Sequence, residues 1–190
     1  MFSKIPYYLI DFTVKVLTLN LLVIKRIISP YTDTKTVLDL GCGVGTFAPL
    51  FRKGGYLGID INKESIEYAR KKNPGYKFKV EDVTNFKLAE KFDTVLIIGV
   101  LHHISDEDVI KVLRCSSICL RKGGKIIAIE AIPPLFKWNL PGQFLRANDS
   151  GKFIRSTKEY KTLIEKKFKI NTYRNVFGGF FDYAYIVASY

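Results

Sequence analysis

Cysteine is scarce in this chain of 190 residues, which contains three and has no C-x-x-C pair or cluster of cysteine with histidine. That pattern argues against a zinc site, so we predict no metal and expect buried thiols in a reducing cytoplasm. Long apolar runs are missing from the first 29 residues, where the longest uncharged run, residues 16–24, is too short to cross a bilayer. No small-residue cleavage site follows that run, which argues against a signal peptide.

Acidic residues are also few, with 18 against 30 lysines and arginines and a net charge of +12. This balance is typical of a lysine-rich surface on a soluble enzyme, but it also suits an anionic membrane or a nucleic acid. Because no arginine-rich tract or aromatic RNA-binding signature accompanies it, nucleic acid is not the favoured partner. With 47% hydrophobic and 25% charged residues, the chain is predicted to be a single globular domain.

The most informative stretch is residues 37–47, where a short apolar run containing Asp39 leads into Gly41, Gly43 and Gly45. We predict a buried strand, a glycine loop and then a helix over residues 47–52 whose positive end faces the loop. Glycines let backbone N–H groups approach a ligand closely, so this turn suits a nucleotide-like ligand. Thr46 stands where the dinucleotide fingerprint has its third glycine, which disfavours a nicotinamide enzyme.

Acidic residues follow the next two predicted strands. Asp60 ends the strand at 56–60, and its carboxylate can accept both hydroxyls of a ribose. A helix over 61–72 and an edge strand over 76–80 come next, and Glu81 and Asp82 stand directly after that strand. The strongly apolar run at residues 92–98 predicts the central strand of a parallel sheet. The remaining predicted elements are this central strand at 92–98, a helix at 106–120, strands at 125–130, 168–176 and 182–188, and a last helix that opens with Ser156 or Thr157 as its cap.

The spacing D-x-G-x-G-x-G from Asp39 to Gly45 resembles motif I of the class I S-adenosylmethionine-dependent methyltransferases. The end of the 92–98 strand, G-V-L-H-H-I, is similar to that of their ubiquinone and menaquinone methyltransferase-like branch. The resemblance implies an α/β fold built on a doubly wound, mostly parallel, Rossmann-like seven-stranded sheet whose last strand is antiparallel. It also implies S-adenosylmethionine as the cofactor and S-adenosylhomocysteine as the product.

The same resemblance assigns roles around the cofactor. The glycine loop lies against the methionine part, and the acid at Asp39 orients the amino end, directly or through water. Asp82 is expected to bond the adenine amine, with Glu81 as the alternative. The cofactor-binding residues implied in this way are Asp39, Gly41, Cys42, Gly43, Gly45, Asp60, Ile61, Asp82, Val83, Gly99 and Leu101.

His102 and His103, the two histidines of the chain, follow the 92–98 strand at its carboxyl end, where doubly wound sheets bind ligands. Imidazole can take a proton from an attacking hydroxyl or an acidic carbon near neutral pH, so both are candidate catalytic residues. His103 matches the family's position better. Both can equally be structural, bonding the backbone and shaping the pocket floor.

The single domain is predicted to consist of an N-terminal helical cap at 1–33, a cofactor-binding core at 34–130, a substrate lid loop at 131–157, and a last helix with a closing hairpin at 158–190. Long irregular loops in compact domains are usually functional. The candidate substrate-pocket residues are Phe144, Arg146, Arg155 and Tyr183. Residues 1–29 either cover the cofactor or lie on a membrane as an amphipathic segment that reaches a lipid substrate.

The expected function is therefore methyl transfer to a small-molecule or lipid-like acceptor through O, N or C, by direct in-line displacement. Two alternatives stay open: an RNA methyltransferase that uses the basic surface, and a non-catalytic partner subunit that only binds the cofactor. The expected location is the cytoplasm, either free or peripheral on a membrane.

Overall fold

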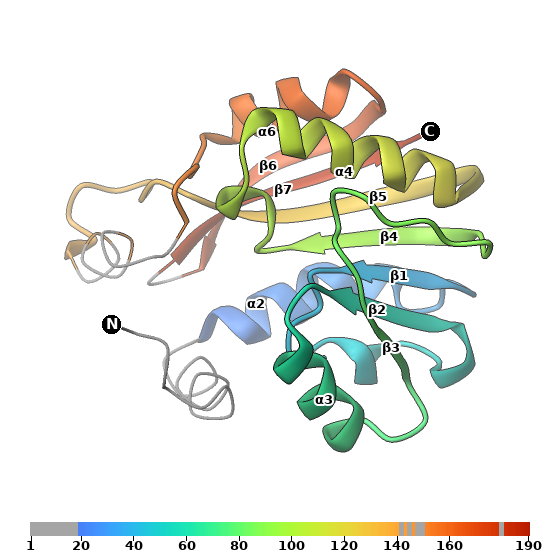
Figure 1. The fold of residues 1–190 in the computed structure, drawn as a ribbon. Helices are drawn as coiled ribbons and strands as arrows, with labels where there is room; N and C mark the ends of the chain where they lie inside the picture. The colour runs from blue at the N-terminus through green and yellow to red at the C-terminus, as the bar shows by residue number, and fades with distance from the viewer. Residues whose placement is uncertain (1–18, 141–142, 144–145, 147–150, 179–180) are drawn as a thin grey trace.

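A computed structural model describes residues 19–140, 143, 146, 151–178 and 181–190 of the chain, and seven strands of this part form one sheet (Figure 1). The strand order is β3-β2-β1-β4-β5-β7-β6. Neighbours from β3 to β5 are parallel, whereas β7 runs antiparallel to both β5 and β6. The predicted fold class is confirmed. The bounds are β1 Val37–Leu40, β2 Tyr56–Asp60, β3 Lys77–Val80, β4 Phe92–Ile98, β5 Leu120–Ile132, β6 Lys169–Gly178 and β7 Phe181–Ser189.

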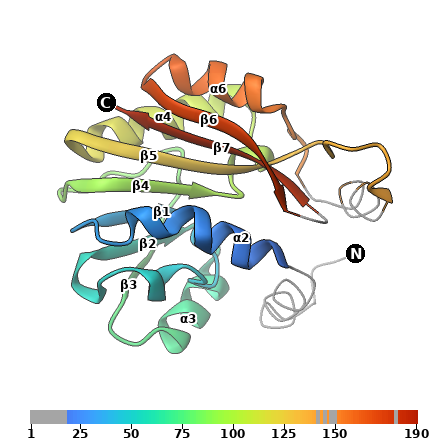
Figure 2. The ribbon, with the colours of Figure 1, turned by 180° about the vertical axis from the view of Figure 1, so that it is seen from behind.

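Apolar layers cover both faces of the sheet. On one face lie α4 (Asp106–Cys119) and α6 (Thr157–Glu165), which bury Leu113 and Ile164 against the strands (Figure 1). The other face carries α2 (Leu19–Ile28), seen in front of the sheet in Figure 2. Ile66 of α3 (Lys63–Lys72) belongs to this second layer. The helices therefore hold the sheet from two sides and leave the carboxyl ends of its parallel strands for a ligand.

The described part of the N-terminal cap is α2, which packs on the sheet. Ile24 and Ile28 are buried in the second layer, and the hydroxyls of Tyr31 and Tyr185 lie 2.7 Å apart. Residues 1–18 lie outside the described residues, so covering of the cofactor and membrane contact by this segment stay predictions. None of the described helices combines the length and apolar character needed to cross a membrane.

The predicted helix over residues 47–52 is wrong. Two single 3₁₀ turns, Ala48–Leu50 and Lys53–Gly55, stand in its place, and Phe51 between them is extended at φ −117° and ψ 165°. Pro49 removes a backbone donor, and the stretch before the Gly54–Gly55 pair is too short for another turn. The glycine loop is therefore not followed by an α-helix, and the expected helix dipole is missing from this part of the site.

Other predicted boundaries shifted by a few residues. The helix expected from residue 61 begins at Lys63, because the Asn62 side chain accepts the Ser65 N–H at 2.8 Å and caps it. Strand β5 begins directly after α4, and its pairing with β4 jumps from Phe92–Leu120 to Thr94–Lys125. The expected turn at residues 121–124 is thus a bulge within the strand. The last helix is capped by Ser156.

Candidate active site

The glycine loop after β1 requires glycine for two reasons. Gly41, Gly43 and Gly45 have φ values of +67°, +50° and +70°, a region that side chains rarely allow. At Gly41 a Cβ would also lie 2.4 Å from Cγ2 of Val100. The Gly41 N–H donates to Ile59 O at 2.8 Å, which ties the loop to the end of β2. Glycine is therefore required at Gly41 both by the backbone conformation and by the close packing of Val100.

Asp60 joins the end of β2 to this loop. Its Oδ2 accepts the Gly43 N–H at 2.9 Å, and its Oδ1 accepts the Asn62 N–H at 2.8 Å. Each carboxylate oxygen can accept two hydrogen bonds, so both oxygens keep an acceptor position for ribose hydroxyls. The two backbone donors fix the carboxylate in place before a ligand arrives.

A pocket of about 340 Å³ opens beside this carboxylate at the carboxyl ends of the parallel strands. Ligand sites of this kind start at about 300 Å³. Ile61 is 70% exposed and presents an apolar surface to the pocket. The structure brings together here Gly41, Asp60, Ile61, Asp82, Val83, Gly99 and His103 of the predicted set, together with Thr84, Val100 and Ile104, which the sequence reasoning missed although they neighbour predicted residues.

Asp82 also lines the pocket and is held by a tight local turn. Its Oδ1 accepts both the N–H and the hydroxyl of Thr84, each at 2.8 Å. Asp82 lines the pocket, whereas the alternative, Glu81, does not, and the Glu81 N–H donates to Asp60 O at 3.0 Å. The geometry therefore favours Asp82 for the adenine contact.

Asp39 lies behind the glycine loop and not on the pocket wall. It is 1% exposed, and its Oδ2 accepts the hydroxyl of Tyr56 at 2.6 Å. Burial raises the pKa of Asp39 to about 7, the Tyr56 hydrogen bond opposes that rise, and the Asp60 charge adds to it. Burial likewise raises the pKa of the nearby Cys42 thiol, with Asp39 and Asp60 contributing. Direct contact of Asp39 with the cofactor does not fit this geometry.

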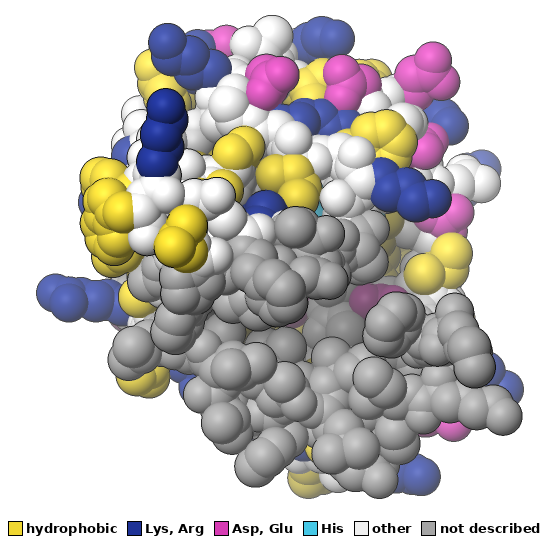
Figure 3. Space-filling model, turned by 90° about the vertical axis from the view of Figure 1, so that its left-hand side faces the viewer, with side chains coloured by type: hydrophobic (Ala, Val, Ile, Leu, Met, Phe, Trp, Pro, Cys, Tyr) yellow, Lys and Arg dark blue, Asp and Glu magenta, His cyan; other side chains and the backbone are white. Residues whose placement is uncertain are grey.

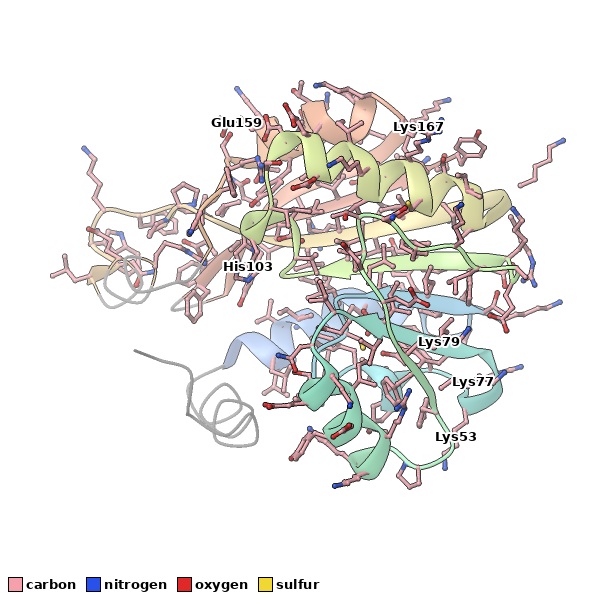
Figure 4. All side chains as sticks on the ribbon, in the orientation of Figure 1. Lys53, Lys77, Lys79, His103, Glu159 and Lys167 are labelled. Atoms are coloured by element: carbon pink, nitrogen blue, oxygen red, sulfur yellow. The ribbon has the colours of Figure 1, made fainter. Side chains whose placement is uncertain are left out.

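The two histidines occupy different environments. His103 is exposed and lines the pocket at the carboxyl end of β4 (Figure 4). His102 is 6% exposed, and its Nδ1 lies 2.9 Å from Oε2 of Glu130. The two imidazole rings are 4.0 Å apart between centroids. Of the two histidines, His103 is therefore the one on the pocket wall, while His102 lies behind it against Glu130.

Glu130 organises the loop that follows β4. It is 1% exposed, and its Oε1 accepts the N–H groups of Val100 and Leu101, both at 3.0 Å. The His102 N–H donates to Oε2 at 3.4 Å, and the His102 imidazole Nδ1 lies 2.9 Å from the same oxygen. Sequence reasoning ended a strand at Glu130 without giving it a role. The available signal was an acid at a strand's carboxyl end, as at Asp60.

Arg155 was predicted to contact the substrate, and the structure assigns it to the scaffold. Its Nη1 donates to Leu101 O at 2.8 Å and Phe153 O at 2.9 Å, and its Nη2 donates to Ile104 O at 2.9 Å. Nε and Nη2 also reach Oδ1 of Asp106, at 2.8 and 2.6 Å. All five guanidinium donors are engaged, so none remains for a substrate. Arg155 instead clamps the loop that carries both histidines.

The other predicted substrate residues lie near the start of β7 or outside the described part. Phe144 lies outside the described residues. Arg146 stacks 4.9 Å from the Phe181 ring, and Tyr183 is half-buried on β7. Beside them Asp182 is 1% exposed, and its Oδ2 accepts the Leu135 N–H at 2.7 Å.

Among the described residues, the second oxygen of Asp182, Oδ1, is buried and has no hydrogen-bond partner. A buried carboxylate oxygen in that state calls for a donor. In the described part of the chain, no group of three or more His, Cys, Asp or Glu side chains is placed to hold a metal ion.

Comparison with known proteins finds a methyltransferase domain within the chain. The family model described as a methyltransferase domain matches residues 37–124, which include the glycine loop, Asp60, Asp82 and both histidines. A putative methyltransferase of Invertebrate iridescent virus 6 is 35% identical over 53% of this chain and 38% of that protein. The ubiquinone biosynthesis O-methyltransferase of Pelagibacter ubique is 34% identical over 64% of this chain and 56% of that protein. The chain thus spans about half the length of the curated relatives it matches.

Solved structures share the fold. An S-adenosylmethionine-dependent methyltransferase of Methanosarcina mazei superposes with a TM-score of 0.68 over 85% of this chain and 96% of that one, at 20% identity. Magnesium protoporphyrin IX methyltransferase of Synechocystis PCC 6803, solved with bound S-adenosylhomocysteine, superposes with a TM-score of 0.67 over 89% of this chain and 81% of that one, at 19% identity. The family model over residues 37–124, the relatives and the shared fold together support a class I S-adenosylmethionine-dependent methyltransferase.

Proposed function

We propose that this chain transfers a methyl group from S-adenosylmethionine to a small-molecule or lipid-like acceptor through O, N or C. The observation that carries the proposal is that Asp60, Asp82 and His103 line one pocket. A relative acting on a lipid supports it: the fatty-acid O-methyltransferase of Mycolicibacterium smegmatis is 32% identical over 53% of this chain and 39% of that protein. The name of the Pelagibacter ubique relative points in the same direction.

The residues around the pocket fit this cofactor. Asp60 would hold the ribose hydroxyls through its two oriented oxygens, and Asp82 would accept the adenine amine. The exposed side chain of Ile61 would cover the adenine face, since an apolar side chain that is 70% exposed gains from burial. The methionine part would lie against the glycine loop, whose Gly41 lines the pocket. When bound, the cofactor supplies a methyl group that its sulfonium charge has already activated.

The task left to the protein is to align the acceptor and exclude water, which can supply several kcal/mol of the barrier. For a hydroxyl or acidic carbon acceptor, His103 would take the released proton, because it is the histidine that faces the pocket. His102, Glu130 and Arg155 would act through the loop they hold together. An amine that arrives neutral needs no base.

The acceptor is proposed to enter between His103 and the start of β7. Asp182 supports this assignment, because its unpartnered Oδ1 would gain a donor from a hydroxyl or amine of the acceptor or from the lid. Residues 131–157 remain the proposed lid. Their described part includes the turn after β5, which the Asp182 carboxylate anchors through Leu135.

Incubation with methyl-labelled cofactor and separate pools of lipids, small molecules and RNA tests the proposal. We expect label in the lipid or small-molecule pool and none in RNA. Label in RNA alone would favour the alternative of an RNA methyltransferase that uses the basic surface of this chain, whose 190 residues carry a net charge of +12. Binding of S-adenosylhomocysteine without transfer to any pool would favour the non-catalytic partner subunit instead.

A further inference from the structure

Four large apolar side chains project together from the end of the molecule beyond β5. Phe136, Trp138, Leu140 and Phe177, called here the apolar tip, are 42%, 69%, 68% and 48% exposed. The Phe136 and Trp138 rings stack at 5.2 Å, and Phe177 meets Phe136 edge-on at 5.7 Å. Soluble proteins seldom gather such side chains on their surface without a partner for them.

The apolar tip is part of an ordered turn. The Leu135 N–H donates to the buried Asp182 carboxylate at 2.7 Å, which fixes the beginning of the turn. Asn139 is 4% exposed, and its N–H donates to Phe136 O at 3.1 Å. The Gln143 amide donates to Lys137 O at 2.6 Å. The turn thus buries its polar asparagine and holds Trp138 outward.

The position of the apolar tip links it to the active site. It follows β5 at the carboxyl edge of the parallel strands, the edge at which Figure 4 labels His103. Figure 3 views the molecule from this end, where hydrophobic side chains lie beside lysines and arginines in the upper part. Lys137 lies between Phe136 and Trp138 in the turn, and the whole chain carries a net charge of +12.

We infer that the apolar tip docks on an anionic lipid bilayer, with Trp138 and Leu140 in the interfacial layer and Lys137 among the headgroups. Tryptophan suits that layer because its ring is apolar and its N–H is polar. Basic residues add attraction to anionic lipids. The inference deepens the proposed function and rests on it, since a molecule docked this way turns the acceptor side of its pocket toward substrates dissolved in the bilayer.

A protein partner fits the apolar tip less well. A stable protein interface covers about 800 Å² on each side and involves about 20 residues. The apolar tip offers three apolar side chains on one turn and a fourth on β6, with a cationic side chain among them. A bilayer needs no matching shape, and a few inserted aromatic residues together with basic ones give measurable, reversible binding.

Trp138 makes the inference directly testable, because it is the single tryptophan of the chain. Its fluorescence is recorded with vesicles of phosphatidylcholine alone and of phosphatidylcholine mixed with phosphatidylglycerol. We expect a blue shift with the mixed vesicles, quenching by lipids brominated along their chains, and weakening by salt. An unchanged spectrum, or the same shift with phosphatidylcholine alone, would overturn the inference.

Paired variants separate the apolar tip from the rest of the surface. Leu140→Ala together with Phe136→Ala is expected to lower vesicle partition by about tenfold or more, from the apolar area removed. Ile118→Ala on α4, where the side chain is 58% exposed, is the matched control and should leave partition unchanged. Equal losses in both would refute the role of the apolar tip.

A second pair of variants tests how much the charge of Lys137 contributes to vesicle binding. Lys137→Gln should weaken partition about fivefold, which corresponds to about 1 kcal/mol for one basic residue at an anionic surface. Lys77→Gln is the control, because Lys77 is exposed on β3 and labelled far from His103 in Figure 4. Partition of Lys137→Gln equal to that of Lys77→Gln would contradict the proposed orientation.

Two further readouts distinguish docking on a bilayer from self-association and from loss of the cofactor site. A blue shift that grows with protein concentration in the absence of vesicles would mean that the apolar tip joins copies of the chain, and it would overturn the inference. Calorimetry with S-adenosylhomocysteine on each variant should show unchanged affinity. Failed vesicle binding with intact cofactor binding and methyl transfer refutes the docking alone, whereas absent methyl transfer with intact docking refutes the proposed function.

Discussion

Replacing Asp60 with alanine tests how the cofactor is held. The carboxylate accepts the N–H groups of Gly43 and Asn62 at 2.9 and 2.8 Å and lines the pocket. The variant loses the proposed ribose contacts and also the bond that positions the glycine loop. A hydrogen bond to a charged group contributes about 1.5–3 kcal/mol, so the Kd for S-adenosylhomocysteine should rise by about 10- to 100-fold.

Isothermal titration calorimetry measures this Kd. Two further variants serve as an intermediate case and as a control. Asp60→Asn keeps one acceptor oxygen and should fall between wild type and Asp60→Ala. Asp93→Ala is the matched control, because Asp93 also accepts a backbone N–H, from Thr36 at 3.0 Å, and pairs with Arg121 at 2.9 Å, but does not line the pocket. It should lower stability and leave the Kd unchanged.

Binding of S-adenosylhomocysteine by Asp60→Ala within about twofold of wild type would refute this role of the carboxylate. That result would mean that the ribose is held elsewhere. Thermal unfolding of each variant without ligand separates lost affinity from lost folding, since a folded Asp60→Ala protein with weak binding is the expected outcome.

Three further predictions concern the buried acid, the base and the glycine loop. Because burial raises the pKa of Asp39 to about 7, the folded state holds that proton more tightly than the unfolded chain, and stability is lost as pH rises from about 4 to about 7. Asp39→Asn should remove this loss. The unfolding free energy of the variant minus that of wild type, measured in urea, should therefore increase by about 2–3 kcal/mol from about pH 5 to about pH 8. A difference that stays the same at both pH values would contradict the assignment. His103→Ala should lower turnover with the S-adenosylhomocysteine Kd unchanged, whereas wild-type turnover would discard its role as base. Gly41→Ala should weaken cofactor binding at least about tenfold because its Cβ would meet Val100 at 2.4 Å, and adding Val100→Ala should recover part of the loss; no recovery would place the defect in the backbone conformation alone.

Much of the cofactor pocket could be predicted because its residues are close to regular elements. Asp60 and Asp82 were placed by the ends of two strands, and the structure brings both to one pocket with Gly41 and His103. The carboxyl ends of neighbouring parallel strands meet at one edge, so strand order alone brings such residues together. The expected helix over residues 47–52 does not form, because Pro49 removes a backbone donor and Gly54 follows too closely for another turn.

The contacts that Arg155 and Glu130 make behind the pocket could not be predicted from the local sequence pattern. Arg155 resembled a substrate contact in sequence, but its partners Leu101 and Asp106 lie about 50 positions away along the chain. Glu130 had no assigned role for the same reason, because its partners belong to the loop after β4. Such contacts depend on how separate elements pack, which no spacing within one element records.

The sequence by itself determined the central parallel strand, the glycine loop and the acids at the strand ends, because these depend on side-chain period, backbone sterics and chain order. The seven-stranded sheet with its antiparallel last strand was implied by the family resemblance. The tertiary structure decided that His103 faces the pocket while His102 meets Glu130, and that Asp39 turns to Tyr56. It also brought Phe177 of β6 against Phe136 after β5 to form the apolar tip. These outcomes depend on side chains that become neighbours only when distant segments pack against the same sheet.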